Sequence, residues 1–322
     1  KKRWIAIPNN GNHNSPEEQI QFSEDGAWIF PVGSVLIKHF DYPVDDNNPA
    51  ITKKVETRFS VKNSNGDWTY LSYKWNQEQT EAYLVNMSDG DQEPITITEV
   101  GGGTRTEMWN YPSLNDCLNC HNEASKGTLG VRTRYLNSNY DYSSHTPNGV
   151  IGNQLVTLSY LGILDRFIDD GDTSDFLTHT SIDDQDAGLE EKARSYLDLN
   201  CAYCHQPANN LRPVFDLRLS NSLAQTRLIT AGINEPIEGL GSDQKIIFPG
   251  DASKSQIYQR ANNVVPGIMM PPIAKGKVDE KGVALLKEWI DQLNVEPNTD
   301  GYNAPDADIN LALLDDAVLG GS

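Results

Sequence analysis

The sequence predicts a multidomain α+β protein in which an N-terminal antiparallel β-sheet or sandwich domain is followed by two mainly α-helical domains. Three observations predict this class. Apolar and polar residues alternate over much of 28–100, which is typical of half-buried strands. Apolar residues take up helical spacing later in the chain, and the pentapeptide Cys-x-x-Cys-His occurs twice in that later part.

Composition divides the 322 residues into six segments. In chain order, we expect an irregular N-terminal arm (1–27), a β-rich domain (28–103), a first motif domain (104–168), an acidic linker (169–187), a second motif domain (188–295) and an acidic C-terminal tail (296–322). The run Gly101–Gly103 marks the end of the β-rich domain, because glycine interrupts strand patterns.

The strongest strand signal lies in residues 54–75. Val55, Thr57, Phe59 and Val61 share one face of a strand, and Trp68–Trp75 is rich in aromatic and β-branched residues. Between them, Asn63-Ser64-Asn65-Gly66 has the residues that tolerate positive φ in turns. We therefore predict a β-hairpin, with further strands at 35–40, 82–85 and 95–100.

Four stretches have the apolar spacing of helices. These are Asn153–Phe167, Leu189–Asn200, Ser253–Ala261 after the turn Pro249-Gly250-Asp251, and Asp279–Leu293, where Asp279 can cap the helix. The second and fourth can cross each other and enclose a small domain.

The repeated pentapeptide carries the chemistry. It reads Cys117-Leu-Asn-Cys120-His121 and Cys201-Ala-Tyr-Cys204-His205, and together the two copies use all four cysteines of the chain. Cys-x-x-Cys-His is the attachment signature of a c-type haem. Each thiol adds to one vinyl group of the porphyrin, and the histidine then coordinates the iron. We predict two covalently bound haem c groups, so that the two mainly α-helical domains are cytochrome c haem domains and the second is of the class I type.

Two other chemistries use Cys-x-x-Cys pairs. A zinc site built from two such pairs usually separates them by about 15–20 residues, whereas Cys120 and Cys201 are much further apart. A redox-active dithiol does not explain a histidine at the same offset in both copies. Haem is therefore favoured over zinc or a dithiol.

The sixth iron ligand is predicted for one haem only. Met270 precedes Pro271-Pro272, and a stiff extended loop can hold its thioether sulfur over the second haem; Met269 is the competing choice. The first haem has no comparable signal. Its sixth position is open, or is filled by one of Met108, His145, His39, Lys38 and Met87.

Charged residues near the motifs allow two further interpretations. Arg132 and Arg134 follow the first motif, and either of them is a candidate partner for a haem propionate, although ordinary surface arginines are equally compatible. The acidic run from Asp169 to Asp186 invites calcium binding, but it lacks the final Glu of an EF-hand loop. A solvated linker is the favoured interpretation.

Composition also limits partners. The formal net charge of −19 argues against nucleic acid and anionic membranes. No run of about 18 apolar residues exists, so we expect no transmembrane segment. No apolar stretch follows Lys1-Lys2-Arg3-Trp4, which suggests a mature chain, or a fragment of one, from which any export signal has been removed.

The chain resembles a family of exported bacterial di-haem cytochromes c. The resemblance runs from about Phe30 to Leu293. Beside the haem motifs it rests on Phe30–Lys38, Glu56-Thr57-Arg58, Tyr73–Asn76, Tyr111-Pro112-Ser113, Leu129-Gly130, Thr133-Arg134, Leu136-Asn137, Asn153-Gln154-Leu155, Ala193–Leu197, Pro249-Gly250-Asp251 and Met270-Pro271-Pro272. Members often accompany soluble quinoprotein-like sugar dehydrogenases. The resemblance implies a periplasmic or extracellular protein that accepts electrons from an exported dehydrogenase or another cytochrome.

These observations favour an electron-transfer protein over an enzyme. The main alternative is a di-haem peroxidase-like enzyme with an open first haem, where His145 or Glu123 would have to act as the acid–base group. A third possibility is a haem-bearing subunit of a larger extracellular assembly, in which the chain associates with itself.

Overall fold

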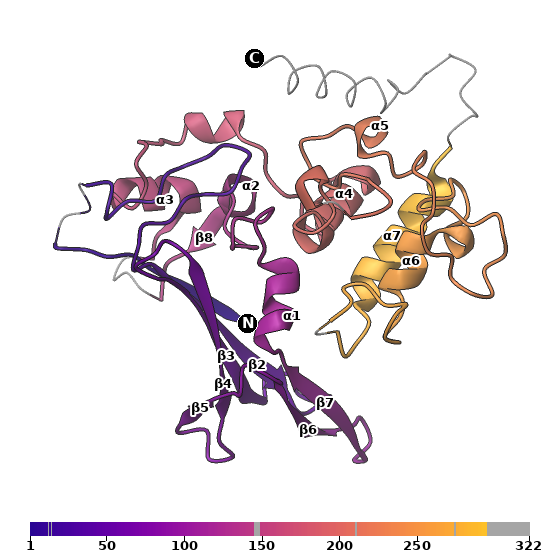
Figure 1. The fold of residues 1–322 in the computed structure, drawn as a ribbon, viewed down its shortest axis with the longest axis horizontal. Helices are drawn as coiled ribbons and strands as arrows, with labels where there is room; N and C mark the ends of the chain where they lie inside the picture. The colour runs from indigo at the N-terminus through magenta and orange to yellow at the C-terminus, as the bar shows by residue number, and fades with distance from the viewer. Residues whose placement is uncertain (12, 14, 145–148, 210, 274, 295–322) are drawn as a thin grey trace, which may run out of the picture.

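A computed structural model describes residues 1–11, 13, 15–144, 149–209, 211–273 and 275–294. Its N-terminal part is built on a five-stranded antiparallel sheet with strand order β1-β2-β3-β4-β5 (Figure 1). The strands are β1 (Lys2–Ala6), β2 (Val35–Pro43), β3 (Thr52–Lys62), β4 (Trp68–Trp75) and β5 (Ala82–Leu84). The hairpin predicted over 54–75 is the pair β3–β4, in which Lys62 lies opposite Trp68.

A second, two-stranded sheet contains β6 (Asp91–Thr98) and β7 (Thr104–Tyr111). Gly101–Gly103 lies in the turn between these strands, so β-structure continues beyond residue 103. Buried side chains from both sheets form one core: Phe40, Val55, Ile95 and Ile97.

The first motif lies at the centre of the molecule, on the short helix α1 (Leu114–Cys120), which follows β7 closely (Figure 1). It is followed by α2 (Thr133–Leu136), the hairpin β8 (Asn139–Asp141) and β9 (Ile151–Asn153), and α3 (Gln154–Tyr160). Part of the N-terminal segment packs on this region, because Ile20, Trp28 and Phe30 share a core with Leu155. Residues 1–27 are therefore not an irregular arm throughout: they contain β1 and the buried Ile20.

The second motif belongs to a region with its own core (Figure 1). Its long helices are α4 (Leu189–Cys201) and α7 (Glu280–Gln292), and its short helices are α5 (Leu223–Thr226) and α6 (Gln256–Ala261). Asp279 caps α7 as predicted, by accepting a hydrogen bond from the Gly282 N–H at 3.2 Å. Gly282 lies directly against the Tyr196 ring of α4, where an added Cβ would be 2.3 Å from ring carbons. The missing side chain thus lets the two helices cross closely.

The prediction of two mainly α-helical haem domains is wrong. Around the first motif, the described helices contain only four to seven residues each. The helix predicted over Asn153–Phe167 ends at Tyr160, because Gly162 adopts a left-handed φ of +73° and turns the chain. In the second region, loops and turns occupy most of the chain between α4 and α7. Apolar residues three or four positions apart can also be buried by a loop. Leu164, for example, is buried although it lies beyond the end of α3.

The acidic segment 169–187 is not simply a solvated linker. Phe176 is buried in the core beside the first motif, and His179 binds Asp198 of α4. The acidic tail predicted at 296–322 and His145 lie outside the described residues. In the part of the chain that the structure describes, no helix has the length and apolar character needed to cross a membrane.

Candidate functional site

The two Cys-x-x-Cys-His motifs, 84 positions apart in the chain, meet in space. The thiols of Cys120 and Cys204 are close enough to shift each other's pKa. Around them, the Asn122 side chain donates to the Asn209 side chain at 2.9 Å, and the Gln206 side chain donates to the Ala124 carbonyl at 3.4 Å. The second cysteine of each motif therefore lies at a common junction, which sequence reasoning did not anticipate.

Local sequence explains how α1 presents the first motif. Ser113 and Asp116 form a capping box, in which the Ser113 hydroxyl accepts from the Asp116 N–H and the Asp116 carboxylate accepts from the Ser113 N–H. The helix ends where the His121 N–H donates to the Cys117 carbonyl at 2.8 Å. Both cysteines are thus on the helix, and His121 follows its last residue.

The imidazole of His121 is held in one orientation by backbone and aromatic contacts. Its Nδ1 lies 2.8 Å from the Gly127 carbonyl, which also accepts a hydrogen bond from the Tyr70 hydroxyl at 2.9 Å. The Tyr70 ring, from β4, lies 4.6 Å from the imidazole centroid. A carbonyl acceptor fixes the proton on Nδ1 and leaves the Nε2 lone pair for a metal, which is the usual arrangement of a ligating histidine.

Gly127 is required for this arrangement. Its φ is +77°, and an added Cβ would lie 2.1 Å from Cδ1 of Trp68. Neither the backbone conformation nor the space admits another residue without rearrangement.

The second motif is built in a similar way at the end of α4. The His205 N–H donates to the Cys201 carbonyl at 2.9 Å, and the Leu217 N–H donates to the His205 carbonyl at 3.0 Å. The Phe215 ring stacks on the imidazole with a centroid distance of 4.5 Å and an interplanar angle of 14°. Burial lowers the pKa of His205 to about 4 and also lowers the pKa of His121, so both imidazoles are neutral at pH 7.

All four cysteines are free thiols and are partly buried. Burial raises the pKa of Cys117, and raises that of Cys201 to about 12. The interaction between the Cys120 and Cys204 thiols lowers the pKa of Cys120 and raises that of Cys204. Thioether formation would remove these four acidic groups from the site.

Met270 lies in a loop that borders the second motif. The Met270 N–H donates to the Arg260 carbonyl at 2.9 Å, and the Arg260 charge adds to burial in lowering the pKa of His205. The Lys275 ammonium donates to the Met270 carbonyl at 3.0 Å. Met269 is 8% exposed and Met270 is partly buried.

The described candidates for the sixth position of the first haem lie on β2, on β7 and in the loop between β5 and β6. Both ring nitrogens of His39 are in contact with polar partners, Thr57 at 2.7 Å and Asp41 at 3.2 Å. Met108 is 48% exposed on β7, and the Met87 carbonyl accepts from the N–H of Leu114 at 2.7 Å. Lys38 lies on the same sheet face as Tyr70, on the side of His121.

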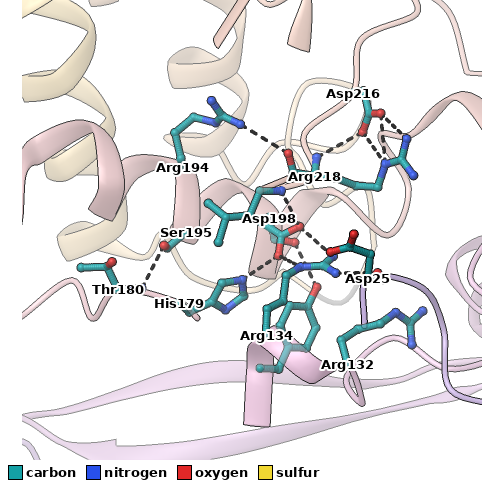
Figure 2. A network of polar contacts seen from close by, with 12 residues as sticks. Asp25, Arg132, Arg134, His179, Thr180, Arg194, Ser195, Asp198, Asp216 and Arg218 are labelled. Atoms are coloured by element: carbon teal, nitrogen blue, oxygen red, sulfur yellow. Dashed lines mark hydrogen bonds and ion pairs between the residues drawn. The ribbon is translucent and has the colours of Figure 1, made fainter. Parts of the chain in front are cut away.

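A buried carboxylate links the two motif regions (Figure 2). Asp198 of α4 is fully buried and accepts two hydrogen bonds from the guanidinium of Arg134 in α2, at 2.6 and 2.9 Å. Nε2 of His179 lies 2.6 Å from the same carboxylate. These partners lower the pKa of Asp198 against the opposing effect of burial. Sequence reasoning missed Asp198, although it lies one helical turn before Cys201.

The two arginines proposed as propionate partners are engaged with protein groups. Arg134 binds Asp198, and the Arg132 guanidinium donates to the carbonyls of Ser125, Thr128 and Val131 at 2.7–3.0 Å. Burial lowers the pKa of Arg132 to about 10. Both arginines are 7% exposed, so they are not ordinary surface arginines, and their guanidinium groups already bind protein acceptors.

The residues of the site fit a covalently bound haem in their donor chemistry. Each motif offers two free thiols and a partly buried neutral imidazole, and the Nδ1 of His121 is bound to a carbonyl. Within the described residues, no three side chains of Cys, His, Asp or Glu converge on a common metal position. Comparisons with protein-family models, curated proteins and solved structures found no match.

Proposed function

We propose that this protein is a di-haem c-type cytochrome that transfers electrons between two adjacent haems. The observation that carries the proposal is the proximity of the Cys120 and Cys204 thiols, which are close enough to shift each other's pKa, together with the hydrogen bonds that join the two motifs around them. In a c-type cytochrome, each of these sulfurs is bonded to the edge of its own porphyrin. Two porphyrins attached at neighbouring sulfurs have neighbouring edges, which suits rapid electron exchange.

The chain's own residues have distinct roles in this proposal. The thioethers would be formed by Cys117, Cys120, Cys201 and Cys204. The proximal iron ligands would be His121 and His205, and the sixth ligand of the second iron would be Met270. A c-type haem supplies an iron that alternates between ferrous and ferric states. Tyr70 and Phe215 hold the two imidazoles in place, so that ligand geometry changes little when the charge of the site changes.

The Arg134–Asp198 pair supports the proposal because it fixes one motif region against the other. Its two hydrogen bonds join α2, which follows the first motif, to α4, which leads into the second. A fixed junction between two redox groups keeps their separation constant, and electron exchange depends steeply on that separation.

The remaining parts of the proposal rest on the motif chemistry and the family resemblance. Haem attachment to Cys-x-x-Cys-His takes place outside the bacterial inner membrane, so we place the protein in the periplasm or outside the cell. Its partner would be an exported dehydrogenase or another cytochrome. The net charge of −19 favours a partner with a basic docking surface.

The optical spectrum of the dithionite-reduced protein, recorded before and after addition of carbon monoxide, tests the proposal. The protein is produced in a host that attaches c-type haem, and we expect c-type bands with the intensity of two haems per chain. Bands that carbon monoxide leaves unchanged would indicate two six-coordinate irons, as expected of an electron carrier.

Two other results would contradict the proposal. The absence of haem bands would favour the zinc or dithiol alternative. A shift of about half of the Soret intensity would show that one iron accepts an external ligand, and would favour the peroxidase-like alternative. The double variant Cys117→Ser/Cys120→Ser is the matched control, because it keeps one motif intact and identifies the haem that responds.

A further inference from the structure

Three cationic residues lie side by side across three strands of the five-stranded sheet. Arg3 of β1 is directly opposite Lys38 of β2, which is directly opposite Arg58 of β3. Directly paired residues in antiparallel strands project from the same face of a sheet, and like charges in such positions destabilise the pairing. We call this set the cationic row.

Only one member of the cationic row has an anionic partner. The Arg58 guanidinium donates to the carboxylate of Glu56 at 2.6 and 2.8 Å, and Glu56 is fully buried. Within the described residues, no carboxylate lies within ion-pair distance of Arg3 or Lys38. Arg3 and Lys38 therefore have no ion-pair partner among the described residues, on a chain whose net charge is −19.

Lys38 is the more confined of the two. Its ammonium lies 5.1 Å from the centroid of the Phe40 ring, and the Arg58 guanidinium lies 4.9 Å from the same centroid. Lys1 approaches this ring as well, at 5.6 Å. Burial, together with the neighbouring cations, lowers the pKa of Lys38 to about 7. The folded chain thus holds Lys38 where a bound anion would stabilise its charged form.

The cationic row faces the first motif. Tyr70, which contacts His121, lies on the same face of the sheet as Arg58, since Tyr70 pairs with Ser60 two residues further along β3. The charges of Lys38 and Arg58 add to burial in lowering the pKa of His121, and the Arg58 charge also acts on Cys117.

We infer that Lys38 and Arg3 bind the two propionate carboxylates of the haem attached at Cys117 and Cys120. This inference rests on the proposed haem at the first motif. The match is one of charge, because Arg3 and Lys38 have no ion-pair partner among the described residues, and a haem would bring two carboxylates to a face that also carries Lys1. Lys38 and Arg3 thus take the place of Arg132 and Arg134 as the propionate partners, because the guanidinium groups of those two arginines bind other protein groups.

The test compares Lys38→Met and Arg3→Gln with the control Lys2→Gln in the haem-loaded protein. Lys2 neighbours Arg3 in β1, projects to the opposite face, and pairs with Asp41 at 3.3 Å. Arg3 is on an exposed edge strand, so its substitution keeps the test open if Lys38→Met impairs folding. The readouts are the reduction potential of each haem and the carboxylate bands of the redox-difference infrared spectrum.

We expect Lys38→Met and Arg3→Gln to lower the reduction potential of one haem, because each removes a positive charge that stabilises the ferrous state. At a fixed electrode potential, the ferrous-to-ferric ratio of that haem should fall about tenfold, with a shift of its carboxylate bands. Lys2→Gln should leave both readouts unchanged. The same haem should be the one that is lost in Cys117→Ser/Cys120→Ser.

Three results would overturn the inference. If both variants keep the native potentials and carboxylate bands while two haems are attached, only the propionate assignment fails. If Lys38→Met changes the iron coordination seen in the visible spectrum, Lys38 is an iron ligand instead. If the native protein attaches no haem, the proposed function fails as well.

Discussion

Replacing Asp198 by Asn should lower the free energy of unfolding far more than the loss of an ordinary ion pair. The carboxylate is fully buried, and its main partner Arg134 is 7% exposed. The substitution keeps the shape of the side chain but leaves the guanidinium of Arg134 without its counter-charge, and His179 loses the same partner. Breaking a buried pair in this way costs about 3–5 kcal/mol.

The assay is urea-induced unfolding of the haem-loaded protein, followed by far-ultraviolet circular dichroism and by haem absorbance. Asp183→Asn is the matched control: its pair with Lys281 also joins distant segments, at 2.9 Å, but the two side chains are 69% and 72% exposed. An exposed pair contributes about 0.2–1 kcal/mol. If Asp198→Asn costs no more than Asp183→Asn, the Arg134–Asp198 pair does not hold the two motif regions together.

Three further outcomes are expected. Met270→Leu should lower the reduction potential of one haem in a spectroelectrochemical titration, because a thioether ligand raises it; Met269→Leu should leave that potential unchanged, and the reverse result would exchange their roles. Gly127→Ala should lower the unfolding midpoint and perturb the spectrum of one haem, since its Cβ would meet Trp68 at 2.1 Å; an unperturbed spectrum would contradict the assigned role of Gly127. Because the pKa of Asp198 is lower in the folded protein than its usual value of about 3.9, its stabilising contribution is present above pH 4 and is lost as the pH falls through the folded pKa. Unfolding measured between pH 6 and 3 should therefore show a smaller loss of stability in Asp198→Asn than in the native protein, and parallel curves would refute this.

Local patterns were the most informative part of the sequence. The β3–β4 hairpin follows from alternating side chains and the turn at 63–66, and both are properties of neighbouring residues. The helix α7 follows from its apolar spacing and the cap at Asp279. The helix expected over Asn153–Phe167 was overextended, because its apolar spacing continues past Gly162 while the backbone turns there.

Long-range features of the site were not readable in the same way. Asp198 is three residues before Cys201, but its partner Arg134 is 64 positions away and nothing in either local sequence connects them. The cationic row could not be predicted for the same reason. The alternation of apolar and polar residues predicts strands that contain Lys38 and Arg58, but only the register between β2 and β3 shows that these two residues are opposite each other. Sequence spacing made Arg132 and Arg134 candidates for the propionates because they are close to the motif along the chain, whereas in the structure both bind other protein groups.

The electron paramagnetic resonance spectrum of the fully oxidised protein tests the central claim, that two haems lie beside each other at the Cys120–Cys204 junction. We expect magnetic coupling between the two ferric irons, so that the native spectrum differs from that of the single-haem variant Cys117→Ser/Cys120→Ser. A native spectrum that is the simple sum of two uncoupled low-spin signals, one of them identical to the signal of the variant, would contradict the account.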